Sequence, residues 1–313
     1  MYSGQGSGYY TMGGPLYSQS SVFREWLQLG DTILKDHHYP SLIESLYLTH
    51  RSHVPFDNIN ISHPGIAIVQ FAASKVLEAE GIVPGAVWGN SLGELTASTI
   101  SGRIDFETMV ETSVHQLNAL RSACEPGGVL TILGETSLYG EVEEFTQCEL
   151  AGVNFSKHFS IAGAASLISK AEKAAKELKI PYWLLPVNFG FHSSAIDPAR
   201  AAMLKWNSLI TVNKAKCEYI SSAQENYINY FPYDHFWDAI RKPLLFQKTL
   251  EQVYDPAKFY IDLGPTGTLA TFFKYNLPAY APQNWMMTMH PSRTDCLWLQ
   301  ELRSKLLNCK AIV

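Results

Sequence analysis

The chain has few of the features that mark secreted, membrane-spanning and metal-binding proteins. Its 313 residues include five cysteines, at Cys124, Cys148, Cys217, Cys296 and Cys309, with no C-x-x-C pair. An odd and unpatterned set of thiols argues against a disulfide framework and favours a reducing, cytoplasmic environment. The sequence also has no apolar run long enough to cross a bilayer, no signal-peptide pattern and no H-E-x-x-H spacing. We therefore expect no membrane segment and no metal site.

A basic surface for nucleic acid is missing as well. The chain has 24 Lys and Arg residues against 29 Asp and Glu residues, which gives a net charge of −5. No basic stripe interleaved with aromatic residues is present, so a nucleic-acid partner is not expected. With 46% hydrophobic and 17% charged residues, the composition is that of a globular protein with a large core. We expect a monomer.

The most informative stretch surrounds Ser91. A short apolar run at residues 81–87 predicts a buried strand, and residues 95–100 can begin a helix. Between them lies G-x-S-x-G, with Gly89 and Gly93 on either side of the serine. A strand, this motif and a helix together are typical of a nucleophile elbow, in which a sharp turn exposes the serine hydroxyl. The next backbone N–H, that of Leu92, lies at the helix start and can stabilise an oxyanion.

Helical periodicity predicts four helices in the first part of the chain, at residues 22–34, 42–48, 65–79 and 106–121. Pro64 suits the first turn of the third helix, with Ser62 as its candidate cap. Asp105 is the candidate N-cap of the fourth. Further helices are predicted at residues 198–209 and 297–307.

The hydrophobic pattern changes in the middle of the chain, where short strands alternate with helices. Strands are predicted at residues 129–133, 148–154, 158–162 and 182–187, and helices at 137–145 and 164–178. This β-α-β-β-α-β order is ferredoxin-like. The predicted fold class is α/β. A large α/β-hydrolase-like subdomain with a parallel sheet comprises residues 1–127 and 194–313, and a small ferredoxin-like subdomain is inserted at 128–193.

A serine nucleophile needs a base, and the best candidate is His192. It lies in the segment Asn-Phe-Gly-Phe-His-Ser at residues 188–193, directly after the last strand of the inserted subdomain. A loop at this position returns the chain to the large subdomain that carries Ser91. The other nine histidines remain alternatives on position alone.

These motifs resemble the malonyl-CoA:acyl-carrier-protein transacylases and the acyltransferase domains of fatty-acid and polyketide synthases. The matching segments follow the family's order over nearly the whole chain. They are residues 3–7 (GQGS loop), 89–94 (GHSxGE elbow), 151–154 with 161–163 (a strand pair), 190–193 (AFHS), 243–246 (PVxF) and 262–265 (xxGP).

The resemblance implies a mechanism. Ser91 attacks a thioester carbonyl while His192 takes its proton, and the backbone N–H groups of Gln5 and Leu92 bind the oxyanion. The backbone carbonyl of Ala239 is the expected partner that orients the imidazole, with no acidic third residue. No bound cofactor is implied, since the acyl group arrives on the 4'-phosphopantetheine of an acyl carrier protein or on CoA.

The acyl carrier protein is therefore the expected partner. Lysines at positions 170, 173, 176 and 179 can form part of a docking face for an acidic carrier protein. The alternative is that these lysines simply make a solvated helix face.

The chain departs from the family pattern at the acyl pocket. Malonyl-specific members carry an arginine 25 residues after the nucleophile, and this chain has Gln116 there. A charge-assisted pair with the malonyl carboxylate is typically worth about 1.5–3 kcal/mol. Asn90 replaces the usual histidine, and His63 lies where glutamine is common; the alternative for His63 is a cap of its helix. We assign the pocket to these three residues together with Phe189 and Phe191.

The missing arginine resembles a branch of stand-alone acyl hydrolases, which clear unwanted acyl groups from carrier proteins in polyketide systems whose acyltransferases act in trans. A proofreading hydrolase of acetyl and longer neutral acyl thioesters is the function that this resemblance implies. Three alternatives stay open: a transferase of neutral acyl groups, a malonyl-CoA transacylase, and a non-catalytic carrier-binding protein suggested by Asn90.

Overall fold

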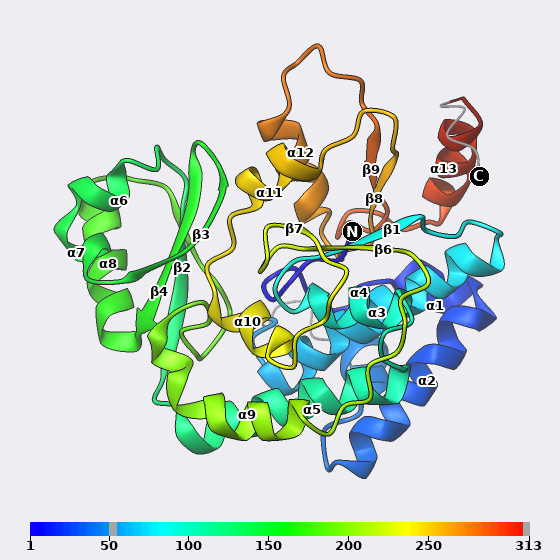
Figure 1. Cartoon of the computed structure of the whole chain (residues 1–313), viewed down its shortest axis with the longest axis horizontal. Coiled ribbons are helices and arrows are strands. Elements are labelled where there is room, and N and C mark those ends of the chain that lie inside the picture. Colours follow the sequence, from blue (N-terminus) through cyan, green and yellow to red (C-terminus); the bar gives the residue numbers. More distant parts are fainter. Residues whose placement is uncertain (50–54, 309–313) are drawn as a thin grey trace.

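The computed structural model describes residues 1–49 and 55–308. Cys309 lies outside the described residues. The strands are β1 (Ala86–Gly89), β2 (Gly127–Ile132), β3 (Glu149–Phe155), β4 (His158–Ala164), β5 (Tyr182–Leu184), β6 (Glu218–Ser221), β7 (Asn226–Tyr227), β8 (Tyr260–Asp262) and β9 (Trp285–Met287). Figure 1 shows β2–β5 as a separate sheet at one side of the molecule, and the remaining strands surrounded by helices.

The helices before the small sheet are α1 (Gly14–Gln19), α2 (Ser21–Asp36), the π-helix Glu44–Leu48, α3 (Ile59–Ala79), α4 (Gly93–Ile100) and α5 (Phe106–Ala123). Within and after it come α6 (Leu138–Glu141), α7 (Glu143–Thr146), α8 (Ala165–Glu177), the 3-10 helix Ser194–Ala199 and α9 (Arg200–Asn207). The last helices are α10 (His235–Arg241), α11 (Phe246–Val253), α12 (Thr268–Asn276) and α13 (Leu297–Asn308). Within residues 1–49 and 55–308, no helix combines the length and apolar character that a bilayer crossing requires.

The first residues of the chain join two strand pairs into one parallel layer. β1 pairs with β6 in parallel, and β8 pairs with β9 in parallel. The Tyr2 N–H donates to the Trp88 carbonyl at 2.9 Å, and the Leu263 N–H donates to the Met1 carbonyl at 3.0 Å. Residues 1–2 therefore lie between β1 and β8, and the predicted parallel sheet of an α/β fold is confirmed.

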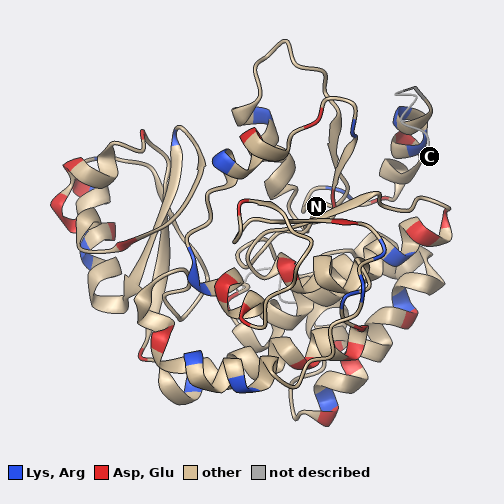
Figure 2. Cartoon of the chain, viewed as in Figure 1, with Lys and Arg blue, Asp and Glu red and all other residues tan. Residues whose placement is uncertain are grey.

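The small sheet has the strand order β3-β4-β2-β5, and all its neighbouring strands are antiparallel. This is the ferredoxin-like order. Its core lies between the sheet and α8, where Phe145, Phe159, Ile161 and Ile168 are buried. Figure 2 shows most of the charged residues on the outer helices and in loops, whereas the strands are largely uncharged. The α/β class with two sheets is thus as predicted, whereas the boundaries at residues 128 and 193 stay predictions.

The cap of α5 is confirmed and that of α3 is corrected. Asp105 accepts a hydrogen bond from the Thr108 N–H at 2.8 Å. α3 begins at Ile59, six residues earlier than predicted, with Asn58 as its N-cap in place of Ser62. The Asn58 side chain accepts from the Asn60 N–H at 3.1 Å. Pro64 therefore lies inside α3 and not in its first turn.

The elbow packs so tightly that its flanking glycines cannot carry a side chain. A Cβ on Gly93 would lie 2.0 Å from the Tyr2 carbonyl oxygen, and one on Gly89 would lie 2.6 Å from the Glu94 Cα. Both neighbours are backbone atoms that a side-chain rotation cannot move away. The glycines thus allow α4 to begin directly against the strand formed by residues 1–2.

We predict that Gly93→Ala destabilises the fold strongly, because the new methyl group collides with the backbone of Tyr2. The free energy of unfolding, measured by urea denaturation, should fall by about 3 kcal/mol. Gly140→Ala is the matched control, since a Cβ there meets no atom within 4 Å. Equal stability of the two variants would contradict this account of the elbow.

Candidate active site

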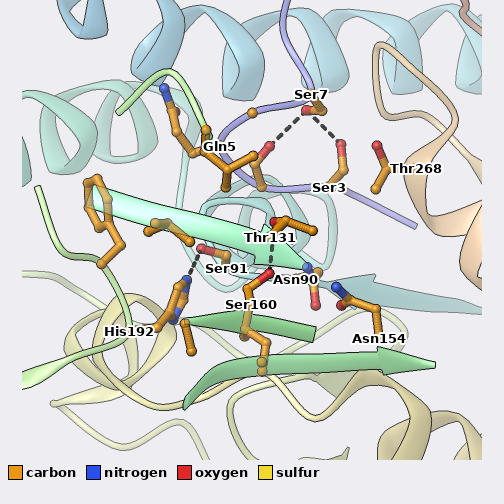
Figure 3. A pocket seen from close by; sticks show the side chains of 18 of the residues that line it. Ser3, Gln5, Ser7, Asn90, Ser91, Thr131, Asn154, Ser160, His192 and Thr268 are labelled. Carbon is orange, nitrogen blue, oxygen red and sulfur yellow. Dashed lines mark hydrogen bonds between the residues drawn. The ribbon is translucent and has the colours of Figure 1, made fainter. Parts of the chain in front are cut away.

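A cavity of about 280 Å³ lies between the elbow and the small sheet. One wall comes from the loop of residues 3–7 and the elbow, and the opposite wall comes from β2, β3 and β4, as Figure 3 shows. Among the described residues, those bordering it are Ser3, Gly4, Gln5, Gly6, Ser7, His63, Asn90, Ser91, Leu92, Val129, Thr131, Leu133, Ala151, Gly152, Asn154, His158, Ser160, Trp183, Leu185, Val187, Phe191, His192, Ile240, Leu244, Thr268 and Phe272.

Ser91 and His192 meet in this cavity. The Ser91 Oγ lies 2.9 Å from the His192 Nε2, and both residues are buried (Figure 3). The φ angles are 56° for Ser91 and 64° for His192, a left-handed conformation that costs energy for residues other than glycine. The packing around both residues maintains this strain, and the distance suits transfer of the hydroxyl proton to the imidazole.

The imidazole is oriented by the backbone at the end of α10. His192 Nδ1 lies 2.8 Å from the Lys242 carbonyl oxygen, and the His192 N–H donates to the Ile240 carbonyl at 2.8 Å. Because a carbonyl only accepts, Nδ1 carries the hydrogen and Nε2 is free to accept from Ser91.

The predicted orienting residue, Ala239, is therefore wrong. Ala239 lies inside α10 (His235–Arg241), where a carbonyl is aligned with the helix axis. Lys242 follows the helix in an extended conformation, with ψ at 149°, and this turns its carbonyl away from the axis toward His192.

The candidate oxyanion donors lie at the same place. Leu92 and Gln5 both border the cavity, and Leu92 is the N-cap residue of α4. In the described part of the chain, neither backbone N–H is engaged with a backbone acceptor outside the regular elements. A Cβ on Gly4 would lie 2.8 Å from the Ser91 Cβ, so the loop passes directly against the nucleophile candidate. The oxyanion role of Gln5 and Leu92 stays a prediction.

Of the predicted pocket residues, His63, Asn90 and Phe191 border the cavity, and Gln116 and Phe189 do not. Gln116 lies behind His63: its Oε1 is 3.1 Å from the His63 Nε2, and its Nε2 donates to the Phe236 carbonyl at 3.4 Å. Phe189 packs edge-on against Phe191, with ring centroids 6.3 Å apart. Gln116 thus lies next to a residue of the cavity lining, but the side chain that borders the cavity is that of His63.

The cavity lining carries no formal charge of its own. The described residues that border it include no Lys, Arg, Asp or Glu. Burial lowers the pKa of His63 to about 4, although the hydrogen bond to Gln116 acts in the opposite direction. Burial also lowers the pKa of His158. A carboxylate entering this cavity would therefore meet no cation near neutral pH.

Polar residues of the small sheet were not found from the sequence. Thr131 and Ser160 share a hydrogen bond of 2.9 Å across β2 and β4, and Asn154 Nδ2 lies 2.9 Å from His158 Nδ1. All four border the cavity, and Figure 3 shows Thr131, Ser160 and Asn154 opposite Ser91. Asn154 lies in one of the family segments, but single polar residues inside strands carry no sequence signal of their own.

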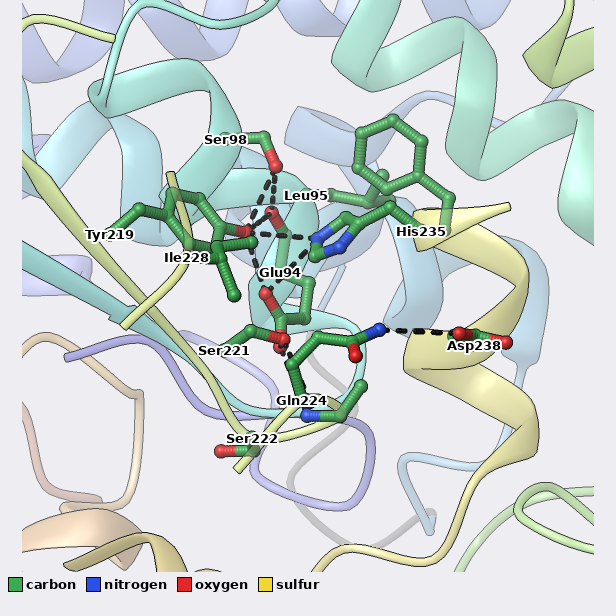
Figure 4. Close-up of polar contacts among 12 residues, drawn as sticks. Glu94, Leu95, Ser98, Tyr219, Ser221, Ser222, Gln224, Ile228, His235 and Asp238 are labelled. Atoms are coloured by element: carbon green, nitrogen blue, oxygen red, sulfur yellow. Dashed lines mark hydrogen bonds and ion pairs between the residues drawn. The ribbon is translucent and has the colours of Figure 1, made fainter. Parts of the chain in front are cut away.

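A second polar cluster lies behind the elbow, and Figure 4 shows it around Glu94. The Glu94 carboxylate accepts from the Tyr219 hydroxyl at 2.6 Å and from the Ser221 hydroxyl at 2.7 Å. His235 Nε2 lies 3.3 Å from the same carboxylate. Glu94 and His235 are fully buried, and the cluster ties α4 to β6 and to α10. Nothing in the sequence linked Glu94 to residues more than a hundred positions away.

The comparisons with known proteins agree on one family. The model described as "Acyl transferase domain" matches residues 1–295. The chain is 35% identical to the polyketide biosynthesis acyltransferase homolog BaeD of Bacillus velezensis over 311 residues, which covers 98% of this chain and 96% of that protein. It is 37% identical to the homolog PksD of Bacillus subtilis over 282 residues, with 89% and 87% covered.

A solved structure shares the fold. The acyl transferase domain of SpnD, in complex with 2-(pent-4-yn-1-yl)malonyl, superposes with a TM-score of 0.86. The superposition covers 98% of this chain and 75% of that one at 19% sequence identity. At this identity the likeness shows the fold alone.

The pKa of His192 predicts the acid limb of any reaction that uses it as a base. Burial lowers this pKa to about 4, and the hydrogen bond to the Lys242 carbonyl offsets the effect only in part. The imidazole is therefore neutral, and able to accept a proton, at every pH above that value. Acylation of Ser91 by a p-nitrophenyl ester, followed by stopped flow, should be constant from about pH 6 to 8 and halve near pH 4. Half-maximal acylation near the ordinary histidine value of about 6.5 would contradict this assignment.

Proposed function

The chain belongs to the acyl transferase domain family, and we propose that it is a serine-dependent hydrolase of acyl thioesters. Its substrates are neutral acyl groups, such as acetyl and longer chains, carried on the phosphopantetheine of acyl carrier proteins. The role is removal of stalled or unwanted acyl groups in polyketide biosynthesis, the process named for BaeD and PksD.

The observation that carries this proposal is the uncharged lining of the cavity around Ser91. No Lys or Arg borders it among the described residues, so the free carboxylate of a malonyl group would lose its hydration without gaining a charged partner. A neutral acyl chain loses no such hydration. A site without a charged group to select its substrate suits a hydrolase that removes several acyl groups better than a transferase that delivers a single one.

Acylation follows from the Ser91–His192 pair. As the Ser91 Oγ attacks the thioester carbonyl carbon, His192 Nε2 accepts the hydroxyl proton across 2.9 Å. In this proposal the backbone N–H groups of Gln5 and Leu92 stabilise the oxyanion. The carbon–sulfur bond then breaks, and His192 gives its proton to the departing thiolate, which leaves as the thiol. The Lys242 carbonyl accepts from Nδ1–H throughout and so holds the ring in position.

Hydrolysis is the same sequence with water in place of the thiol. Water attacks the ester carbon while His192 Nε2 accepts one of its protons. The ester bond to Ser91 breaks, Ser91 Oγ recovers the proton, and the carboxylic acid leaves. Attack by the thiol of a second carrier protein would instead give transfer of the acyl group, which is the alternative function.

Docking of an acidic carrier protein has a candidate surface on α8. Lys170, Lys173 and Lys176 are exposed on this helix, and Lys179 follows it, also exposed. Of these, Lys173 has an ion pair of 3.8 Å with Glu177, which leaves its charge partly compensated. We propose this face as the docking surface of a monomeric enzyme that works without a bound cofactor.

The test is incubation with acetyl-loaded acyl carrier protein, with and without an empty carrier protein as acceptor. We expect free acetate in the absence of the acceptor, at a rate that the acceptor does not raise. Ser91→Ala should abolish release, and His192→Ala should lower it by a factor of about a thousand or more. Acetyl that appears only on the acceptor would instead establish a transferase.

Intact mass spectrometry separates these outcomes from an inactive protein. The wild type should gain the mass of an acetyl group, and Ser91→Ala should not. Absence of the adduct from the wild type would favour the non-catalytic alternative.

A guanidinium at position 116 should shift selectivity toward malonyl. Gln116 lies behind His63, so the ring of His63 separates position 116 from the cavity. We therefore predict a larger rise in malonyl loading for Gln116→Arg combined with His63→Gln than for Gln116→Arg alone, because the ring is then absent. Malonyl loading relative to acetyl loading should rise about tenfold to a hundredfold. Gln116→Met, of similar length and no charge, is the control. Unchanged ratios in the double variant, with a native melting temperature, would remove the selectivity argument.

A further inference from the structure

We propose that His63 selects acyl groups that carry a hydroxyl on the chain, by accepting a hydrogen bond at Nδ1. This inference rests on the proposed function and names its preferred substrate class, the hydroxyacyl thioesters. It starts from an anomaly at the cavity: the buried Nδ1 of His63 has no hydrogen-bond partner among the described residues. His63 is 1% exposed, and it borders the cavity that contains Ser91.

The hydrogen bonds around His63 determine which nitrogen accepts. Gln116 Nε2 donates to the Phe236 carbonyl, so the Gln116 oxygen is the atom that faces His63. That oxygen accepts from His63 Nε2–H at 3.1 Å. The neutral imidazole therefore has its lone pair at Nδ1, and the low pKa of His63, about 4, maintains this form.

Two further unpartnered atoms beside the same cavity are also acceptors. Gln5 Nε2 donates to the Ser62 Oγ at 2.6 Å, and the buried Gln5 Oε1 has no hydrogen-bond partner in the described part of the chain. The same holds for the buried Asn90 Oδ1 within residues 1–49 and 55–308. Gln5, His63 and Asn90 all border the cavity. An unpaired buried acceptor costs free energy that a ligand hydroxyl recovers and a methylene does not.

A set of acceptors identifies its ligand by chemistry. It favours an O–H donor, it gives no gain with a purely aliphatic chain, and it repels a carboxylate. Phe191, whose ring is nearly parallel to that of His63 at 6.1 Å, supplies an apolar surface beside the acceptor. A short acyl chain with one hydroxyl matches both surfaces, whereas acetyl and malonyl match at most one.

The experiment is a competition between butyryl and 3-hydroxybutyryl thioesters of N-acetylcysteamine, with both hydroxyl enantiomers tested. The measured quantity is the ratio of the two acyl adducts on Ser91 at early times, by intact mass. We expect the wild type to favour one hydroxybutyryl enantiomer about tenfold or more. His63→Leu should abolish this preference, so that the butyryl and hydroxybutyryl adducts form in nearly equal amounts.

Two variants serve as controls. His63→Gln keeps a donor toward Gln116 and displaces the acceptor, so it should lose most of the preference even if His63→Leu folds poorly. Asn60→Leu removes another buried oxygen of the same helix, one that has no partner among the described residues, and Asn60 is not among the described residues that border the cavity. The Asn60→Leu variant should retain the wild-type ratio.

The inference is overturned if the wild type shows no preference or if His63→Leu keeps it. An equal fall in hydrolysis of both thioesters in His63→Leu, with an unchanged adduct ratio, would assign Nδ1 to the attacking water and also overturn it. Because the ratio is read from the adduct, it does not depend on hydrolysis. An adduct with the expected preference but no release of acid would reject the proposed hydrolase and support the inference.

Discussion

The buried carboxylate of Glu94 is the interaction on which the arrangement of the site depends. Glu94 follows Ser91 closely in the sequence, and its carboxyl group accepts hydrogen bonds from the hydroxyls of Tyr219 and Ser221 in β6. The same group contacts His235 at the start of α10. The far end of α10 supplies the Lys242 carbonyl that orients His192. One buried group thus connects the element that presents the hydroxyl to the element that orients the imidazole. The carboxyl group is tolerated at this depth because the hydroxyls of Tyr219 and Ser221 donate to it, and loss of either would leave a buried oxygen without that partner.

The described residues that border the cavity are apolar or polar but include no Lys, Arg, Asp or Glu, and burial lowers the pKa of both His63 and His158. Selectivity in such a site comes from hydrogen-bond matching and shape, because no long-range charge attracts or holds a substrate. Hydrogen-bond matching discriminates strongly against an acyl chain that lacks the hydrogen-bonding group, since a buried polar atom of the protein is then left without a partner. It discriminates weakly between chains that differ by one methylene, which accords with an enzyme that accepts several acyl groups.

Sequence reasoning was most successful where a local pattern has a local cause. The Asp105 cap joins residues near one another in the chain, and the nucleophile elbow and the ferredoxin-like subdomain follow from an element order that is read along the chain; each was predicted. It failed for α3, which begins at Ile59 because Asn58 provides an earlier cap than Ser62. It also missed Tyr219, Ser221 and His235, since their partner Glu94 is more than a hundred residues away. Of the predicted pocket residues, His63 borders the cavity whereas Gln116 and Phe189 do not, because packing determines which of two neighbouring side chains reaches a cavity.

The partner of His192 is a main-chain atom, and this has a consequence for how the enzyme can vary. The backbone carbonyl is present whatever side chain position 242 carries, so substitutions at that position can leave the orientation of the His192 imidazole unchanged. The next residue, Pro243, has no such freedom. A proline restricts the residue before it to extended conformations, which here ends α10 and aims the carbonyl of Lys242. The orientation of the His192 imidazole therefore depends on the side chain of Pro243, one position beyond the residue whose carbonyl contacts the ring.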